Sequence, residues 1–90
     1  MANLTLDKSN YKAFSNREKL DLEPKEFEIL WLLAEKPGRV FHGKDLYVEL
    51  KKVYPQLEES PFRRYIHQLR YKLGRRFVQV LDEDRFRLQF

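Results

Sequence analysis

The sequence predicts one small α+β domain, in which an N-terminal antiparallel sheet precedes three helices and a C-terminal β-hairpin. Its 90 residues suffice for a single modest hydrophobic core. Apolar residues alternate near both ends of the chain, as in strands, and recur at helical spacing between them. We expect the sheet over residues 1–22, the three-helix core over 23–74 and the hairpin over 75–90, all in one domain.

The first 22 residues read as short strands. Leu4 and Leu6 alternate with polar residues, and Leu20 and Leu22 repeat the pattern. The segments DKSN and SNRE supply turn residues between these runs. We therefore predict a small antiparallel sheet with one apolar face.

The segment EPKEFEILWLLAEKPG predicts the first helix. Pro24 suits the first helical position, where its missing N–H costs nothing, and Glu26 and Glu28 favour the N-terminal end of the helix dipole. Pro37-Gly38 ends the helix. The apolar stripe comprises Phe27, Leu30, Trp31 and Ala34 at helical spacing, widened by Ile29 and Leu33.

Two further helices and a hairpin follow. GKDLYVELKKV predicts a helix with Leu46 and Leu50 inward, and the loop YPQLEES follows it. Ser60 is the expected N-cap of the third helix, which runs from about residue 61 to 73 and stops at Gly74. In the tail, alternation around Val78 and Val80 and around Phe86, Leu88 and Phe90 predicts two strands joined by Asp82-Glu83-Asp84.

The predicted third helix and the residues just after it hold more net positive charge than the chain as a whole. Residues 60–76 hold six Lys or Arg and no acid, whereas the whole chain has a net charge of +4. A helical projection puts Phe62, Ile66, Leu69 and Leu73 on one buried stripe. The opposite face holds Arg64, His67, Gln68 and Tyr71, flanked by Arg63, Arg70, Tyr65 and Lys72, with Arg75 and Arg76 just beyond the helix.

This face has the chemistry of double-stranded DNA recognition. Arg forms bidentate hydrogen bonds to guanine and Gln does so to adenine, while surrounding cations neutralise phosphates. An ordinary solvated helix face mixes Glu with Lys, as the first two predicted helices do, but this one has no Glu. The face therefore predicts binding to DNA, and a merely solvated face is the simpler alternative.

Two segments resemble a known family. KEFEILWLLAEKPGRVF and YIHQLRYKLG resemble the first and recognition helices of OmpR/PhoB-type winged-helix effector domains, found in bacterial two-component response regulators. The resemblance implies a winged helix-turn-helix with the third helix in the major groove and the hairpin as the wing. It also implies transcription regulation, a loop at residues 51–59 available to RNA polymerase, and a homodimer on DNA. The expected DNA-binding residues are Arg63, Arg64, Tyr65, His67, Gln68, Arg70, Tyr71, Lys72, Arg75, Arg76 and Lys51.

The sequence departs from this family in places that bear on binding. Arg63 stands where an acid is usual early in the third helix, His42-Gly43 replaces the usual Ser-Arg, and Lys51 replaces a common Trp. The Arg-Gly-x-Gly-Tyr wing turn of the family is Asp82-Glu83-Asp84-Arg85-Phe86 here. Carboxylates repel phosphates, so we expect this wing tip to stay out of the minor groove.

Other functions remain open. The acidic wing and Arg63 favour a protein-interaction module on the same scaffold, and a role in RNA binding would need Tyr65 and Tyr71 as stacking groups. A membrane-surface role is disfavoured because the core needs the apolar stripe of the third helix. His42 and His67 are too few and too separated for a metal site, and with zero Cys, thiolate zinc is excluded. We expect no enzyme activity, no cofactor and, without a signal peptide or membrane span, a cytoplasmic location.

Replacing Asp82, Glu83 and Asp84 together by Ala should leave the affinity for duplex DNA equal or tighter, because the change removes three negative charges from a surface near phosphates. Titration of a labelled duplex measures it. A marked loss of affinity would show that these side chains contribute to binding.

Overall fold

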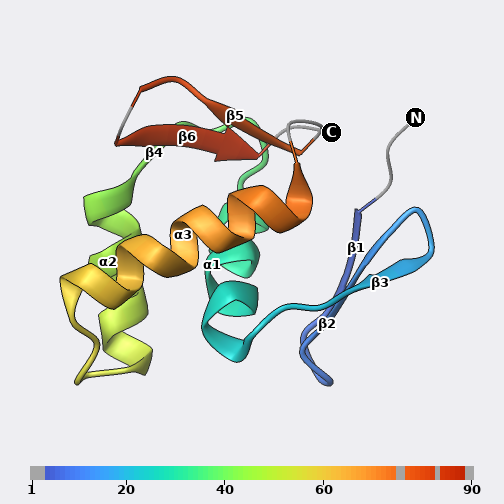
Figure 1. Cartoon of the computed structure of the whole chain (residues 1–90), viewed down its shortest axis with the longest axis horizontal. Coiled ribbons are helices and arrows are strands. Elements are labelled where there is room, and N and C mark those ends of the chain that lie inside the picture. The colour runs from blue at the N-terminus through green and yellow to red at the C-terminus, as the bar shows by residue number, and fades with distance from the viewer. Residues whose placement is uncertain (1–3, 75–76, 83, 89–90) are drawn as a thin grey trace.

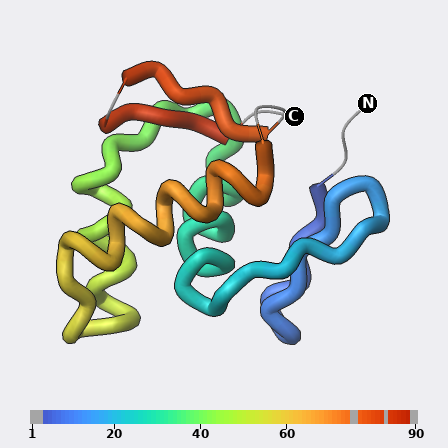
Figure 2. Tube along the Cα trace, in the orientation of Figure 1, coloured from blue at the N-terminus to red at the C-terminus, as the bar shows by residue number. Residues whose placement is uncertain are grey.

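The computed structural model describes residues 4–74, 77–82 and 84–88. In these residues the predicted order of sheet, three helices and hairpin is confirmed (Figure 1). The elements are β1 (Leu4–Asp7), β2 (Lys12–Ser15), β3 (Glu18–Leu20), α1 (Pro24–Glu35), β4 (Phe41–His42), α2 (Gly43–Val53), α3 (Glu59–Leu73), β5 (Val78–Val80) and β6 (Arg85–Leu88). The helix α3 crosses in front of α1 and α2, and the N-terminal sheet and the C-terminal hairpin lie on different sides of the helical core (Figures 1 and 2).

The N-terminal sheet has the antiparallel order β1-β2-β3. Buried Ala13 on β2 pairs with Leu6 on β1 and with Leu20 on β3, so these three residues share the face that turns toward the core. Asn16 and Arg17 connect β2 to β3, with φ angles of 51° and 73°. Positive φ at both central residues is what a two-residue type I′ hairpin turn requires.

Tyr11 joins this sheet to α1. Its ring stacks on Phe27 with centroids 4.9 Å apart, and its hydroxyl donates a hydrogen bond to Oε1 of Glu28. The ammonium group of Lys8 lies 4.9 Å from the Trp31 ring centroid and 3.9 Å from Oε2 of Glu28. The turn between β1 and β2 is thus held against α1 by stacking and by charge.

The core lies between the three helices and is completed by buried residues of the two sheets. On α1, Phe27, Ile29, Leu30 and Leu33 are at most 1% exposed, and Leu46 and Leu50 of α2 are equally buried. The predicted inward stripe of α3 is confirmed, because its buried residues are Phe62, Ile66, Leu69 and Leu73. This stripe fixes which face of α3 turns outward.

The wing is a three-stranded antiparallel sheet of order β4-β6-β5, whereas the sequence predicted a two-stranded hairpin. In β4, Phe41 pairs with Phe86 and His42 pairs with Arg85. A strand of two residues is too short to show alternation in the sequence, so the pattern analysis missed it. Pairing with β4 attaches the wing to the residue that precedes α2.

The start of α3 and the loop before it also differ from the prediction. Ser60 is not the N-cap; Glu58 holds that position, with φ −98° and ψ 160°, and the helix begins at Glu59. The carboxylate of Glu59 suits the first turn because it faces the positive end of the helix dipole. The expected loop at residues 51–59 is therefore shorter: Lys51 belongs to the last turn of α2 and Glu59 belongs to α3.

Glu26 is a buried acid at the contact between α1 and α3. It is 0% exposed, although the sequence predicted only a favourable interaction with the helix dipole. Its Oε1 accepts a hydrogen bond of 2.6 Å from Nζ of Lys72 and one of 2.9 Å from the backbone N–H of Glu23. Its Oε2 makes no hydrogen bond within the described part of the chain. A buried carboxylate with one cationic partner makes that partner structurally important.

Replacing Lys72 by Met should lower the free energy of unfolding by about 2–4 kcal/mol, because the Glu26 carboxylate would be left buried without its cation. Lys52→Met is the matched control. Lys52 pairs with Glu49 at 3.0 Å on the surface, and such an exposed pair contributes less than about 1 kcal/mol. Urea unfolding of both variants makes the comparison, and equal losses would contradict the structural role of Lys72.

Candidate nucleic-acid interface

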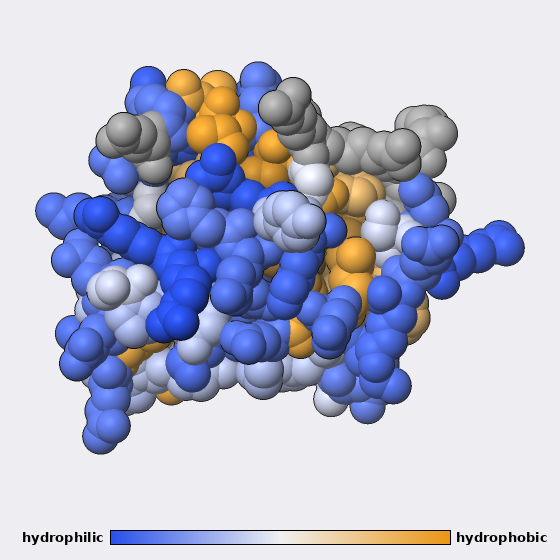
Figure 3. Space-filling view, viewed as in Figure 1, coloured by the Kyte–Doolittle hydropathy of each residue, from blue (hydrophilic) through white to orange (hydrophobic). Residues whose placement is uncertain are grey.

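The outer face of α3 presents the polar residues that the sequence placed there. Arg63, Arg64, His67 and Tyr71 are exposed, and Gln68 is partly exposed. Tyr71 is 89% exposed, which is extreme for a large aromatic side chain on a helix. The space-filling view shows this side of the molecule as predominantly hydrophilic, with hydrophobic residues gathered toward the wing and toward the N-terminal sheet (Figure 3). The predicted outward orientation of this face is confirmed.

Two of the expected DNA-binding residues point instead toward the rest of the protein. Lys72 is held by Glu26 at 2.6 Å. Tyr65 is half-buried against the core, and the ammonium group of Lys25 lies 5.6 Å from its ring centroid. The missed signal was Glu26, which lies four residues before Leu30 on α1 and therefore shares its inward face. A carboxylate buried on that face needs a cationic partner from a neighbouring helix, because an unpaired buried charge is destabilising.

A cation also links α1 to the end of α2. The Lys25 ammonium lies 4.8 Å from the centroid of Tyr54, the residue that caps the C-terminus of α2. Burial raises the pKa of the Tyr54 hydroxyl, and the nearby Glu28 carboxylate and Tyr65 add to the effect. Lys25 of α1 thus contacts both Tyr54 at the end of α2 and Tyr65 on α3.

The remaining expected residues are distributed over different parts of the chain. Lys51 is exposed on the last turn of α2, with its ammonium 5.6 Å from the Tyr47 ring centroid. Arg75 and Arg76 lie outside the described residues. Arg70 is partly exposed on α3. Of the expected residues, those on the described outer face of α3 are accordingly Arg63, Arg64, His67, Gln68, Arg70 and Tyr71.

A groove of about 920 Å³ separates part of this face from the wing. Its walls are the start of α2, the wing-facing side of α3 and the wing turn. Arg63 and Arg70 line the groove, whereas Arg64 and Gln68 do not. The groove contains both signs of charge, because Lys44, Arg63 and Arg70 line it together with Asp45, Glu59, Asp82 and Asp84. His42 and His67 also line it. The wing-facing side of α3 is therefore electrostatically mixed, and Arg64 and Gln68 lie away from the wing acids.

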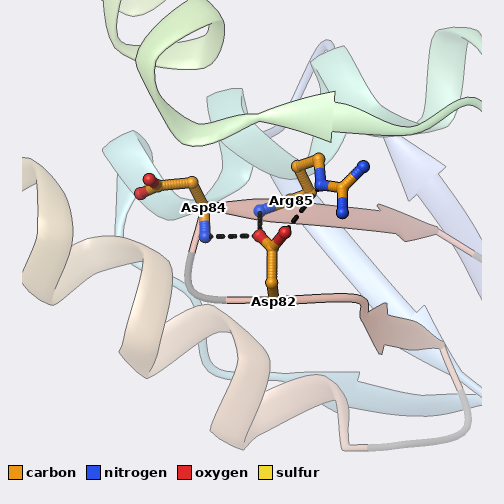
Figure 4. Close-up of polar contacts among 3 residues, drawn as sticks. All are labelled: Asp82, Asp84 and Arg85. Carbon is orange, nitrogen blue, oxygen red and sulfur yellow. Dashed lines mark hydrogen bonds and ion pairs between the residues drawn. The ribbon is translucent and has the colours of Figure 1, made fainter.

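The wing turn is closed by its own side chains. Oδ1 of Asp82 accepts hydrogen bonds from the backbone N–H groups of Asp84 and Arg85, at 3.0 and 2.9 Å, and Oδ2 accepts one of 2.7 Å from Nε of Arg85 (Figure 4). The hydrogen bond from Arg85 and the backbone N–H of Asp84 hold the pKa of the Asp82 carboxyl below its ordinary value. The sequence showed the acids of this turn but not that one of them pairs with Arg85.

Other kinds of site find little support in the described residues. Within them, no three His, Asp or Glu side chains gather closely enough to hold a metal ion. Across the same ranges, no helix has the length and apolar character needed to cross a bilayer.

Comparison with known proteins agrees with this geometry. A family model described as "Transcriptional regulatory protein, C terminal" matches residues 17–83. The transcriptional regulatory protein QseB of Escherichia coli O157:H7 is 33% identical over 79 residues, which make up 88% of this chain and 36% of that protein. The response regulator protein PmrA of Pseudomonas aeruginosa is 27% identical over 78 residues, 87% of this chain and 35% of its own length. The chain thus spans about a third of the length of these relatives.

Solved structures show the same fold. The C-terminal domain of the nisin resistance regulator NsrR, a lantibiotic response regulator, has a TM-score of 0.81 at 21% identity, over 97% of this chain and 92% of that one. The DNA-binding domain of the response regulator AdeR, in complex with an intercistronic region, has a TM-score of 0.77 at 19% identity, over 97% and 93% of the two chains. Together with the match over residues 17–83, these similarities identify the chain as a member of the family of C-terminal domains of transcriptional regulatory proteins, with the OmpR/PhoB-type winged-helix fold.

Proposed function

We propose that this chain binds double-stranded DNA with sequence preference in transcriptional regulation, with α3 in the major groove. The observation that carries the proposal is the outer face of α3, where Arg64, His67 and Gln68 project from a helix that has no acid after Glu59. Membership of the transcriptional-regulator family supports it. The DNA-binding domain of AdeR, which has the same fold, was solved in complex with an intercistronic region, and this supports binding to DNA.

The arrangement of α3 suits a major groove. The helix has 15 residues, and its whole apolar stripe is used by the core, so the opposite side is available to a groove that admits one α-helix. Arg64 and Gln68 are four residues apart, which places them one above the other on this side. Both are able to make bidentate hydrogen bonds to purine edges, and Arg63 and Arg70 flank them as phosphate-contacting cations.

We propose two partners besides DNA, both of which are implied by the resemblance to response-regulator effector domains. RNA polymerase would meet the connection between α2 and α3, residues 54–58, which Tyr47 stabilises by donating a 2.8 Å hydrogen bond to the backbone oxygen of Leu57. A second copy of the chain would bind an adjacent half-site. Selection of bound sequences from random duplexes tests the dimer directly, because two repeats at helical spacing in the selected motif indicate paired copies.

The first experiment is binding to random duplexes at several salt concentrations, followed by selection of the bound sequences. Steep loss of affinity with salt and convergence on one motif support specific DNA binding. Weak binding at low salt without convergence would overturn the proposal and favour a protein partner for the face of α3.

Replacing Arg64 or Gln68 by Ala should each cost about 1–3 kcal/mol of binding free energy on the selected site, because each would lose bidentate hydrogen bonds to a base. The loss should be much smaller on unrelated duplexes. Lys52→Ala serves as the control, since Lys52 pairs with Glu49 on α2. Equal losses on every sequence would mean that these residues contact phosphates only.

The two tyrosines of α3 should behave in opposite ways. Tyr71→Ala should leave the free energy of unfolding within about 0.5 kcal/mol, because Tyr71 is 89% exposed, and should weaken DNA binding. Tyr65→Ala should destabilise the fold by about 1–3 kcal/mol, because Tyr65 packs against the core beside Lys25. Urea unfolding and duplex titration of both variants separate the roles. Loss of stability in Tyr71→Ala would contradict this assignment.

A further inference from the structure

The cation at the tip of the wing already has an anionic partner. Arg85 opens β6, and its Nε lies 2.7 Å from Oδ2 of Asp82. The side chains of the pair are 48% and 47% exposed, so both are accessible to a ligand. Guanidinium groups bind carboxylates and phosphates with the same planar set of N–H donors. A phosphate that approached Arg85 at Nε would have to displace Asp82.

The backbone holds Asp82 in this position. The same carboxylate accepts the N–H groups of Asp84 and Arg85, so its orientation is set by the turn as well as by the ion pair. The turn is itself anchored, because the N–H of Gly43 donates a 2.7 Å hydrogen bond to the carbonyl oxygen of Asp84. Leu81 adds a further bond, from its N–H to the carbonyl oxygen of Arg85 at 2.9 Å. Asp82 is therefore a preorganised competitor for any anion at Arg85.

We propose that Asp82 acts as an internal substitute for phosphate, which occupies Arg85 and keeps the wing from contributing a phosphate contact to DNA binding. The proposal rests on the proposed function, since it concerns how the wing takes part in binding to DNA. In the wild-type chain the phosphate contacts then come from residues outside the tip of the wing. Arg85 becomes a DNA-contacting residue only when Asp82 loses its charge or is displaced. Asp82 thereby sets how many phosphates the domain neutralises.

Simple repulsion between the acidic turn and DNA is the rival explanation. A change at Asp84 distinguishes repulsion from competition for Arg85. Asp84 lies in the same turn, but its carboxylate points away from Arg85 and Asp82 (Figure 4). Removing the charge of Asp84 relieves repulsion without releasing a cation. Removing the charge of Asp82 does both.

Asp82→Asn keeps an oxygen that accepts the backbone N–H groups and removes the negative charge. We expect it to tighten binding to a selected duplex roughly fivefold to tenfold at about 0.1 M salt, because one additional phosphate contact releases about 0.9 counterion. The slope of log affinity against log salt should steepen by about 0.9. Asp84→Asn, the matched control, should tighten binding less and should leave the slope close to that of the wild type.

A double-mutant cycle tests whether the gain passes through Arg85. The effect of Asp82→Asn is measured again in an Arg85→Gln background, with the thermal unfolding midpoint of each variant as a check on folding. Disappearance of the steeper slope in that background supports the proposal. A gain of the same size with and without Arg85 would overturn it, because repulsion alone would then explain the result.

A measurement without DNA keeps this proposal separate from the proposed function. The Nε–H resonance of Arg85 is followed by NMR during titration with inorganic phosphate. We expect a response in Asp82→Asn at phosphate concentrations that leave the wild type unchanged. Equal responses in the two proteins would refute the internal competition even if the chain binds DNA. Absence of duplex binding with a selective response in Asp82→Asn would refute the proposed function and leave the internal competition standing.

Discussion

The contact between α1 and α3 is the constraint on which the rest of the structure depends. The buried stripe of α3 packs on α1, and at its C-terminal end Lys72 reaches the fully buried carboxylate of Glu26. Rotating α3 by a single residue, about 100°, would turn this stripe outward and bring charged side chains into the core. Apolar packing and one buried ion pair therefore fix the face that α3 presents to a ligand.

The same contact divides the cations of α3 into two groups. Lys72 pairs with the buried carboxylate of Glu26. Arg64 projects from the opposite side of the helix and does not line the groove that contains the wing acids. Arg63 and Arg70 lie between these extremes, beside a groove that also holds Asp82 and Asp84. Packing thus gives the cations of α3 three different positions: Lys72 contacts the core, Arg63 and Arg70 face the groove, and Arg64 faces outward. The outward position is the one suited to reading bases.

The wing shows how a local ion pair changes what an element contributes. A hairpin beside a recognition helix is well placed for phosphate contacts, but here its tip pairs Arg85 with Asp82 inside one turn. Pairing of β6 with β4 holds this turn next to the start of α2. The geometry of the winged helix is retained, while the positive charge of Arg85 is paired with Asp82 within the turn.

The sequence by itself determined the order of elements, the extent of α1 and α2, and the inward stripe of α3, because helical periodicity and Pro or Gly breakers are local signals. It placed the start of α3 two residues late, because Ser60 is a good cap by type whereas the cap position belongs to Glu58. The pairing of Arg85 with Asp82, three residues apart, is set by the geometry of one turn. Only the tertiary structure decided that Lys72 and Tyr65 turn inward and that a two-residue strand completes the wing. The reason is physical: helical spacing fixes the angle of a side chain about its own axis, but charge partners and strand partners come from other elements, whose positions no local pattern contains.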